Sequence, residues 1–297
     1  MTPSCRRGFR PLPLLLALLL LQGAAVAHTM RAIPLWPEGK TPDFREGQCV
    51  PELEWWTPSF PQFDACLIVA PGGGYGGYSY DGEGIPVRDY FLDKGVPVAM
   101  LRYRVPRPDG LPKHLAAWQD AQRAVRIVRS MAAEQGIRPG TIGFLGFSAG
   151  GHLALMAATS SQTPAYEPID AIDELPCNID WAVPVYPAYV LSDGVDGINR
   201  DKGNGACELN PEFAFDAATP PMCLLHGDDD VFSAMASVKV YHRLRQMEIP
   251  AELHIFAKKG HCFFMRAADG EPAANWRDRV WEWCRFMGFL AAKPSGT

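Results

Sequence analysis

The 297-residue sequence has no excess of positive charge, because 28 lysines and arginines stand against 33 aspartates and glutamates, a formal net charge of -5. This balance gives no electrostatic reason to expect nucleic acid or an anionic membrane as the main partner. No repeat of fixed period is present, which argues against a solenoid or a propeller. Beyond the first 27 residues there is also no apolar run of the roughly 20 residues that span a bilayer.

The sequence also lacks the usual patterns of cofactor sites. It has no C-x-x-C pair and no paired histidine and cysteine spacing of the kind that binds a metal. It has no G-x-x-x-x-G-K-[ST] sequence, because the G-K-T at residues 39–41 lacks the preceding glycine, and no G-x-G-x-x-G sequence followed by a predicted helix, of the kind that binds phosphates. We therefore expect neither a metal nor an organic cofactor.

The first 27 residues have the three parts of a secretory signal peptide. Three arginines form a basic start, residues 12–21 are rich in leucine, and Ala25-Val26-Ala27 supplies a cleavage signal. An uncleaved anchor is less favoured, because the apolar run is only about half of the roughly 20 residues that span a bilayer. We expect residues 1–27 to be removed and residues 28–297 to form one exported domain, periplasmic or extracellular.

Seven of the eight cysteines follow the expected signal peptide, so at least one thiol is free unless an intermolecular bridge forms. Cys66 and Cys223 lie in apolar, strand-like runs, and we expect both to be buried. Cys177 and Cys207 flank loop-rich sequence and are the best candidates for a disulfide.

From residue 64 onward, short apolar runs alternate with segments whose apolar residues recur at a spacing of three to four. The runs predict strands over residues 66–70, 96–103, 141–147, 180–186, 222–226 and 252–256, and the spacing predicts helices over 113–135, 149–159, 234–247 and 276–290. Continuous apolar strands with intervening helices indicate an α/β fold, a mostly parallel, doubly wound sheet with helices on both faces. We expect residues 28–63 to form edge strands and loops, and residues 187–220 to be an insertion over the carboxyl ends of the strands.

Residues 146–150 carry the strongest chemical motif, G-F-S-A-G, which matches G-x-S-x-G with Ser148 at its centre. The motif follows a predicted strand and opens a predicted helix, as a nucleophile elbow requires. The helix N-terminus beside the serine favours a developing oxyanion. A glycine-rich turn with a capping serine is the less favoured alternative.

A nucleophilic serine needs a base, and that base needs an orienting acid. His261 lies in the loop after the last predicted strand, which is where the catalytic base of an α/β hydrolase lies. Asp228, Asp229 and Asp230 all lie in the turn after the preceding strand. With Asp230 as the acid, the chain order is Ser148, Asp230, His261, the serine–aspartate–histidine order of these enzymes.

A glycine-rich segment, P-G-G-G-Y at residues 71–75, follows an early predicted strand. It is similar to the H-G-G-G oxyanion loop, with proline in place of histidine. The N–H groups of Gly73 or Gly74, together with that of Ala149, are expected to hold a developing negative charge. Tyr75 and Tyr78 follow these glycines and are candidates for flanking a sugar or aryl group of a substrate.

These motifs together resemble those of exported α/β-hydrolase esterases of the acetylxylan/feruloyl-esterase-like (BD-FAE-like) group, which is related to hormone-sensitive-lipase-type carboxylesterases. The resemblance covers nearly all of the mature chain, through P-G-G-G-Y (71–75), L-R-Y-R (101–104), D-A-Q-R-A (120–124), G-F-S-A-G-G (146–151), H-G-D-D-D (226–230) and G-H (260–261). In that group the acid lies four residues after the strand-end histidine, which favours Asp230. The next residues, 231–234, lack the usual Val-Pro pattern, so Asp229 remains an alternative.

The resemblance implies a serine carboxylic-ester hydrolase that removes short acyl (acetyl) or feruloyl groups from polysaccharide or related small esters. The expected partner is therefore a small-molecule or polysaccharide ester, with no nucleic acid and no stable membrane insertion. Two alternatives remain open: a peptidase or amidase of the same fold, and a non-catalytic hydrolase-fold binding protein. An intact set of serine, aspartate and histidine argues against the second.

Overall fold

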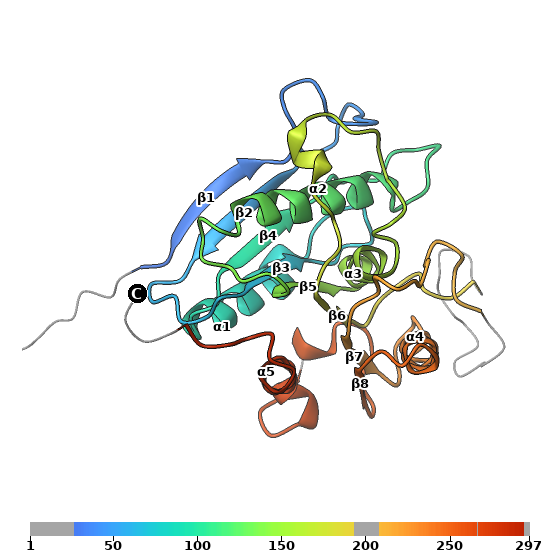
Figure 1. The fold of residues 1–297 in the computed structure, drawn as a ribbon. Coiled ribbons are helices and arrows are strands. Elements are labelled where there is room, and N and C mark those ends of the chain that lie inside the picture. The colour runs from blue at the N-terminus through green and yellow to red at the C-terminus, as the bar shows by residue number, and fades with distance from the viewer. Residues whose placement is uncertain (1–26, 193–207, 266, 294–297) are drawn as a thin grey trace, which may run out of the picture.

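A computed structural model describes residues 27–192, 208–265 and 267–293, and its centre is an eight-stranded sheet (Figure 1). The strands are β1 (Thr29–Pro34), β2 (Glu52–Thr57), β3 (Cys66–Ala70), β4 (Val98–Arg102), β5 (Ile142–Phe147), β6 (Trp181–Val185), β7 (Met222–Gly227) and β8 (Ala251–Phe256). Their order across the sheet is β1-β2-β4-β3-β5-β6-β7-β8. The pairs from β4 to β8 are parallel, whereas β1 and β2 join one edge by antiparallel pairing. The predicted α/β class with a mostly parallel sheet is confirmed.

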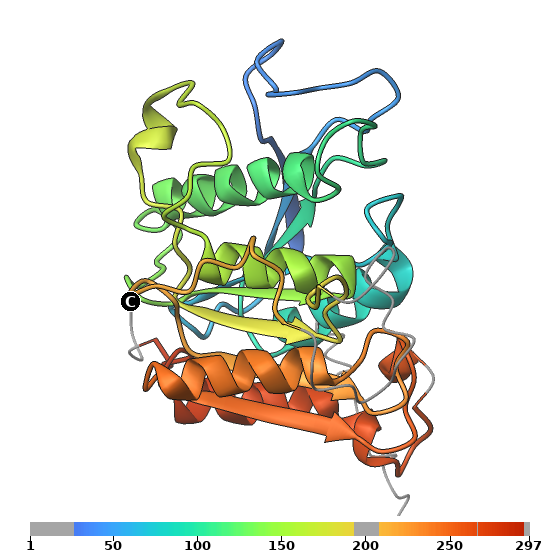
Figure 2. The same ribbon diagram turned by 90° about the vertical axis from the view of Figure 1, so that its right-hand side faces the viewer.

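Five α-helices of the described residues cover the sheet. They are α1 (Ile85–Asp93), α2 (Leu115–Met131), α3 (Ala149–Thr159), α4 (Met235–Gln246) and α5 (Trp276–Phe286). One apolar core lies under α2, α3 and α4, and a second lies under α1 and α5 on the opposite face. In Figure 2 the arrows of the parallel strands point to one side, so the loops that follow these strands gather at one end of the molecule. None of the helices in the described part of the chain is long and apolar enough to cross a membrane.

Strand β3 shows why the apolar runs are continuous. Cys66, Ile68 and Ala70 face the first core, while Leu67 and Val69 face the second. Successive side chains of a strand point to opposite faces, and here both faces are covered by helices. A fully apolar run therefore predicts a strand in the middle of this sheet, as the sequence indicates.

The structure differs from the sequence predictions mainly at the ends of elements and in one helix. Helix α2 is shorter than the predicted 113–135 because its last residues form turns before Gly136, which has a φ of +64°. Helix α1 was not predicted, although Pro86 occupies a first-turn position that favours a helix start. Its buried side chains, Val87, Phe91 and Leu92, pack on the second core.

The cysteines are a second point of comparison. Cys66 and Cys223 are fully buried, as predicted. Cys177 is a free, buried thiol whose Sγ lies 3.2 Å from the carbonyl oxygen of Ser161. Cys177 is thus not in a disulfide, unlike in the predicted Cys177–Cys207 bridge, and Cys207 lies outside the described part of the chain.

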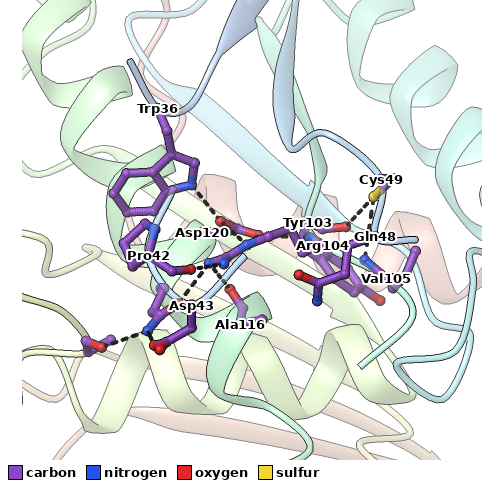
Figure 3. A network of polar contacts seen from close by, with 12 residues as sticks. Trp36, Pro42, Asp43, Gln48, Cys49, Tyr103, Arg104, Val105, Ala116 and Asp120 are labelled. Atoms are coloured by element: carbon purple, nitrogen blue, oxygen red, sulfur yellow. Dashed lines mark hydrogen bonds and ion pairs between the residues drawn. The ribbon is translucent and has the colours of Figure 1, made fainter. Parts of the chain in front are cut away.

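A buried ion pair fastens the end of β4 to α2 (Figure 3). The side chains of Arg104 and Asp120 are both fully buried, with Arg104 Nε 2.9 Å from Asp120 Oδ2. Asp120 also accepts hydrogen bonds from the backbone N–H of Arg104 and from Trp36 Nε1, both at 2.7 Å. The Arg104 guanidinium donates to the carbonyl groups of Pro42 and Ala116. One pair of charges thus connects β4, α2 and the segment between β1 and β2.

Substitution of Asp120 by asparagine tests this ion pair. Asp120→Asn keeps the shape of the side chain but leaves the buried Arg104 cation without its counter-charge, which costs about 3–5 kcal/mol of unfolding free energy. The exposed ion pair between Arg279 and Glu282 supplies the control, and Glu282→Gln is expected to leave stability unchanged within error. Urea unfolding followed by circular dichroism measures both variants, and equal stabilities would contradict the prediction.

Candidate active site

Ser148 lies on a strained turn between β5 and α3, with φ 53° and ψ -114°. Such a conformation is rare for a residue with a side chain and is found mainly at functional sites. The flanking glycines make the turn possible, because a side chain at either position would clash with the backbone. A Cβ on Gly146 would lie 1.9 Å from the carbonyl oxygen of Gly150, and a Cβ on Gly150 would lie 2.1 Å from the carbonyl oxygen of Ala70. The turn places the Ser148 side chain at the carboxyl end of β5 and at the N-terminus of α3.

His261 and Asp230 come together with this serine. His261 Nε2 lies 2.8 Å from Ser148 Oγ, and His261 Nδ1 lies 2.8 Å and 3.0 Å from the two carboxylate oxygens of Asp230. Asp230 is fully buried, whereas Asp229 is exposed to solvent. A carboxylate that accepts from Nδ1–H leaves the Nε2 lone pair directed at the serine hydroxyl. The geometry therefore favours Asp230 over Asp229 as the partner of His261.

His226, at the end of β7, holds the turn that carries Asp230. Burial lowers the pKa of His226 to about 4, so its ring is neutral. Its Nε2–H donates to the Phe232 carbonyl at 2.7 Å, and its Nδ1 lies 2.8 Å from the Ser237 hydroxyl. The Phe232 N–H in turn donates to Asp230 Oδ1 at 2.8 Å. Through these hydrogen bonds, His226 and the backbone of Phe232 hold the turn that carries Asp230.

The glycine-rich segment, residues 71–75, lies directly against the nucleophile, and we call it the oxyanion loop. A Cβ added to Gly72 would lie 2.9 Å from Ser148 Cβ. Gly73 and Gly74 have φ values of +135° and +63°, and no described residue accepts a hydrogen bond from either N–H group. Ala149 is the first residue of α3, so its N–H has no acceptor within the helix. Among the described residues, the N–H groups of all three predicted donors therefore have no acceptor.

Tyr75 and Tyr78 support this loop from behind, which differs from the expectation that they flank a substrate group. Tyr75 is fully buried, and its hydroxyl lies 2.9 Å from His152 Nδ1. Tyr78 is partly buried, and its hydroxyl donates to the carbonyl oxygen of Tyr103. The Tyr103 hydroxyl donates to the Pro71 carbonyl at 2.7 Å. The fully buried Tyr75 therefore supports the loop and does not present a binding surface, whereas Tyr78 supports the loop and keeps part of its side chain exposed.

Two groups of potential metal ligands lie among the described residues. The first joins His114, His152 and Glu212, whose ligand atoms lie within 4.8 Å of one another. Both ring nitrogens of His152 already have partners, since Nδ1 meets the Tyr75 hydroxyl and Nε2 lies 3.3 Å from Glu212. Burial lowers the pKa of His152, the Glu212 carboxylate opposes that shift, and the positive charge of Lys113 adds to it. To bind a metal, His152 would have to give up one of its two partners. The group is best described as a hydrogen-bonded support for Tyr75.

The second group joins Cys223, Glu252 and His254. Burial raises the pKa of the Cys223 thiol, so it stays protonated, whereas a metal ligand must be a thiolate. His254 Nε2 lies 3.2 Å from a Glu252 oxygen and is therefore already hydrogen-bonded. These residues do not fit a metal ion.

Aromatic rings surround His261. The centroids of the Tyr186 and Phe232 rings each lie 4.9 Å from that of His261. Tyr189, from the predicted insertion, packs on Phe232 at 5.4 Å and stacks on Tyr75 at 6.1 Å. The start of the predicted insertion thus packs beside the site through Tyr189, while residues 193–207 lie outside the described part of the chain.

A serine on a strained strand–helix turn, followed along the chain by an aspartate and a histidine after later strands of a mostly parallel sheet, defines an α/β hydrolase. Comparison with known proteins agrees with this class. A family model described as BD-FAE matches residues 61–184. The solved structure of an acetyl ester-xyloside bifunctional hydrolase from Caldicellulosiruptor lactoaceticus is 30% identical and covers 89% of this chain and 97% of that chain, with a TM-score of 0.72. The chain belongs to the BD-FAE family of α/β-hydrolase esterases.

More distant matches share the fold or part of the sequence. A thermophilic esterase from Thermogutta terrifontis with bound propionate is 23% identical, covers 89% of this chain and 97% of that chain, and has a TM-score of 0.68. A curated acetylxylan esterase of Xylanibacter ruminicola is 26% identical over 200 residues, 66% of this chain and 40% of that protein. A probable carboxylic ester hydrolase of Mycobacterium tuberculosis is 24% identical over 64% of this chain and 49% of its own length. The chain thus spans less than half the length of these two curated relatives.

Proposed function

We propose that this protein is a serine carboxylic-ester hydrolase that removes short acyl groups, acetyl or feruloyl, from polysaccharide or related small esters. One observation carries the proposal: a single imidazole, that of His261, lies 2.8 Å from both the Ser148 hydroxyl and the Asp230 carboxylate. This arrangement lets the hydroxyl lose its proton as it attacks a carbonyl carbon.

The proposed reaction has two steps. His261 takes the proton of Ser148, whose oxygen attacks the ester carbonyl, and the N–H groups of Gly73, Gly74 and Ala149 stabilise the negative charge on the carbonyl oxygen. Collapse of this intermediate releases the alcohol, which takes the proton from His261, and leaves the acyl group on Ser148. A water molecule then gives a proton to His261 and attacks the acyl group, and collapse of this second intermediate returns that proton to Ser148 and releases the acid. Asp230 holds the imidazole in the required tautomer throughout.

Support for the acyl-polysaccharide substrate comes from the relatives. The names of two of them, an acetylxylan esterase and an acetyl ester-xyloside bifunctional hydrolase, refer to acetyl esters and to xylose-containing compounds. Export would bring the enzyme to such polymers. The proposed signal peptide, residues 1–27, lies almost entirely outside the described residues. We include this export in the proposal, with residues 28–297 as the mature domain.

A panel of substrates tests the function directly. The wild-type protein is assayed on p-nitrophenyl acetate, acetylated xylan, methyl ferulate and aminoacyl anilides, with Ser148→Ala as the inactive reference. We expect hydrolysis of the esters and little turnover of the anilides. Faster cleavage of the anilides than of the esters would replace the esterase by a peptidase or amidase of the same fold. Binding of xylan without turnover of any substrate would indicate a binding protein.

The length of the acyl chain gives a sharper prediction. The insertion contains four glycines, at positions 194, 197, 203 and 205, which interrupt its apolar residues, so its sequence offers no continuous apolar cover for a long acyl chain. We therefore expect kcat/KM for p-nitrophenyl esters to be highest from acetate to butyrate and to fall by octanoate. A maximum at dodecanoate or longer would contradict this and would indicate a lipase.

A further inference from the structure

We infer that Glu83 is a positioning residue that holds the oxyanion loop against Ser148, an inference that rests on the function proposed above. Glu83 lies in a π-helical turn (Tyr80–Gly84) between the oxyanion loop and α1. Its side chain is not one of the three groups that would carry out the proposed reaction. Turns of this kind are rare and are often found at functional sites.

The burial of Glu83 is costly and therefore needs an explanation. The residue is 1% exposed, and the only charged group that acts on its pKa among the described residues is His261, with no lysine or arginine. A carboxyl group in such a place is tolerated only when hydrogen bonds replace the lost water. Burial raises the pKa of the Glu83 carboxyl, and hydrogen bonds from Gly72 and Tyr186 oppose that shift.

The hydrogen bonds of Glu83 connect three segments of the site. Its Oε2 accepts from the Gly72 N–H at 2.6 Å, and its Oε1 accepts from the Tyr186 hydroxyl at 3.0 Å. The Cys262 thiol donates to Oε1 at 3.6 Å. Gly72 belongs to the oxyanion loop, Tyr186 follows β6, and Cys262 follows the base, His261. One carboxyl group therefore contacts the loop and the surroundings of the base at the same time.

Gly72 lies between Glu83 and the nucleophile. A Cβ added to Gly72 would lie 2.5 Å from Glu83 Oε2 and 2.9 Å from Ser148 Cβ. The Gly72 N–H is used by Glu83, so the predicted oxyanion donors are the N–H groups of the next two residues, Gly73 and Gly74. A shift of the carboxyl group would move these donors relative to Ser148, and a displacement of about 1 Å at such a site is enough to lower catalysis about a hundredfold.

Two substitutions at Glu83 distinguish the effect of losing the hydrogen bond from Gly72 from the effect of changing the side-chain volume. Glu83→Leu fills the same space but has no acceptor for the Gly72 N–H, whereas Glu83→Gln keeps a carbonyl oxygen that accepts from it. With p-nitrophenyl acetate we expect Glu83→Leu to lower kcat about a hundredfold, as for the loss of one oxyanion donor, with KM within threefold of wild type. Glu83→Gln is expected to stay within tenfold. Glu83→Ala is the second deletion if the leucine variant does not fold.

Two further measurements distinguish positioning from general damage. A trifluoromethyl ketone, which forms an oxyanion when Ser148 adds to it, is expected to bind Glu83→Leu about a hundredfold more weakly. Hydrogen exchange of residues 71–75 is expected to become faster in Glu83→Leu and to stay near wild type in Glu83→Gln, and this readout needs no substrate. Gln122→Ala is the control, because Gln122 is a buried polar residue of α2 that bonds to residues 163 and 165, far along the chain from the loop.

The outcomes are distinct. Wild-type protein that hydrolyses no ester and does not bind the ketone would overturn the proposed function, and with it this inference. An active wild type with a folded Glu83→Leu or Glu83→Ala variant whose kcat is within threefold, or whose loss lies in KM alone, would overturn the role of Glu83 and leave the esterase function intact. Unchanged hydrogen exchange of residues 71–75 would do the same.

Discussion

Ser148→Ala is expected to lower kcat/KM for p-nitrophenyl acetate by about 10⁴-fold or more, because the covalent route through the acyl-enzyme is lost with the hydroxyl. The residual rate comes from binding and from the oxyanion loop alone. The melting temperature is expected to change little, since the serine is small and its strained φ of 53° adds nothing to stability.

The assay compares purified wild type and Ser148→Ala at equal concentration, with thermal unfolding followed on the same samples. Ser130→Ala is the matched control: its hydroxyl donates to the Ile127 carbonyl within α2, at 2.7 Å, and has no contact with His261. Activity of Ser148→Ala within tenfold of wild type would remove Ser148 from the role of nucleophile.

The second large effect is expected at Asp230. Asp230→Asn removes the negative charge that fixes the tautomer of His261 and stabilises its protonated form, so we expect it to lower kcat/KM at least about a hundredfold more than Asp229→Asn. The two residues are neighbours and the same change is made at each, so the pair serves as its own control. Asp230 is buried against His261 at 2.8 Å, while Asp229 is exposed. A larger loss at Asp229 would move the acid to that residue.

The sequence predicts this fold well because the patterns that define it are local. Both faces of the sheet are covered, so β3, β5, β6 and β7 are fully buried, mostly apolar runs that stand out from their surroundings. The turn at Ser148 is also predictable, because its strain requires glycines at fixed positions along the chain. Helix α1 is harder to predict, since it follows a glycine-rich loop and its three buried residues are few for a helix signal.

What the sequence does not indicate is which polar residues meet across the core. Glu83 and Gly72 are 11 positions apart, and Tyr75 and His152 are 77 apart, so no spacing rule joins them. Tyr75 also shows how an aromatic residue beside an active-site motif suggests a binding role when it is in fact buried. The choice between Asp229 and Asp230 likewise depends on the direction of each side chain in the turn after β7.

Ser148 and His261 follow strands that differ in pairing and in burial. Ser148 follows β5, an inner strand paired on both sides with β3 and β6. His261 follows β8, the border strand, which is paired only with β7 and is less buried than the inner strands. Local opening begins where backbone hydrogen bonds are few and exposed. We therefore expect local opening to separate His261 from Ser148 at the edge of the sheet before the central strands open, so that the edge strand limits how long the site stays assembled.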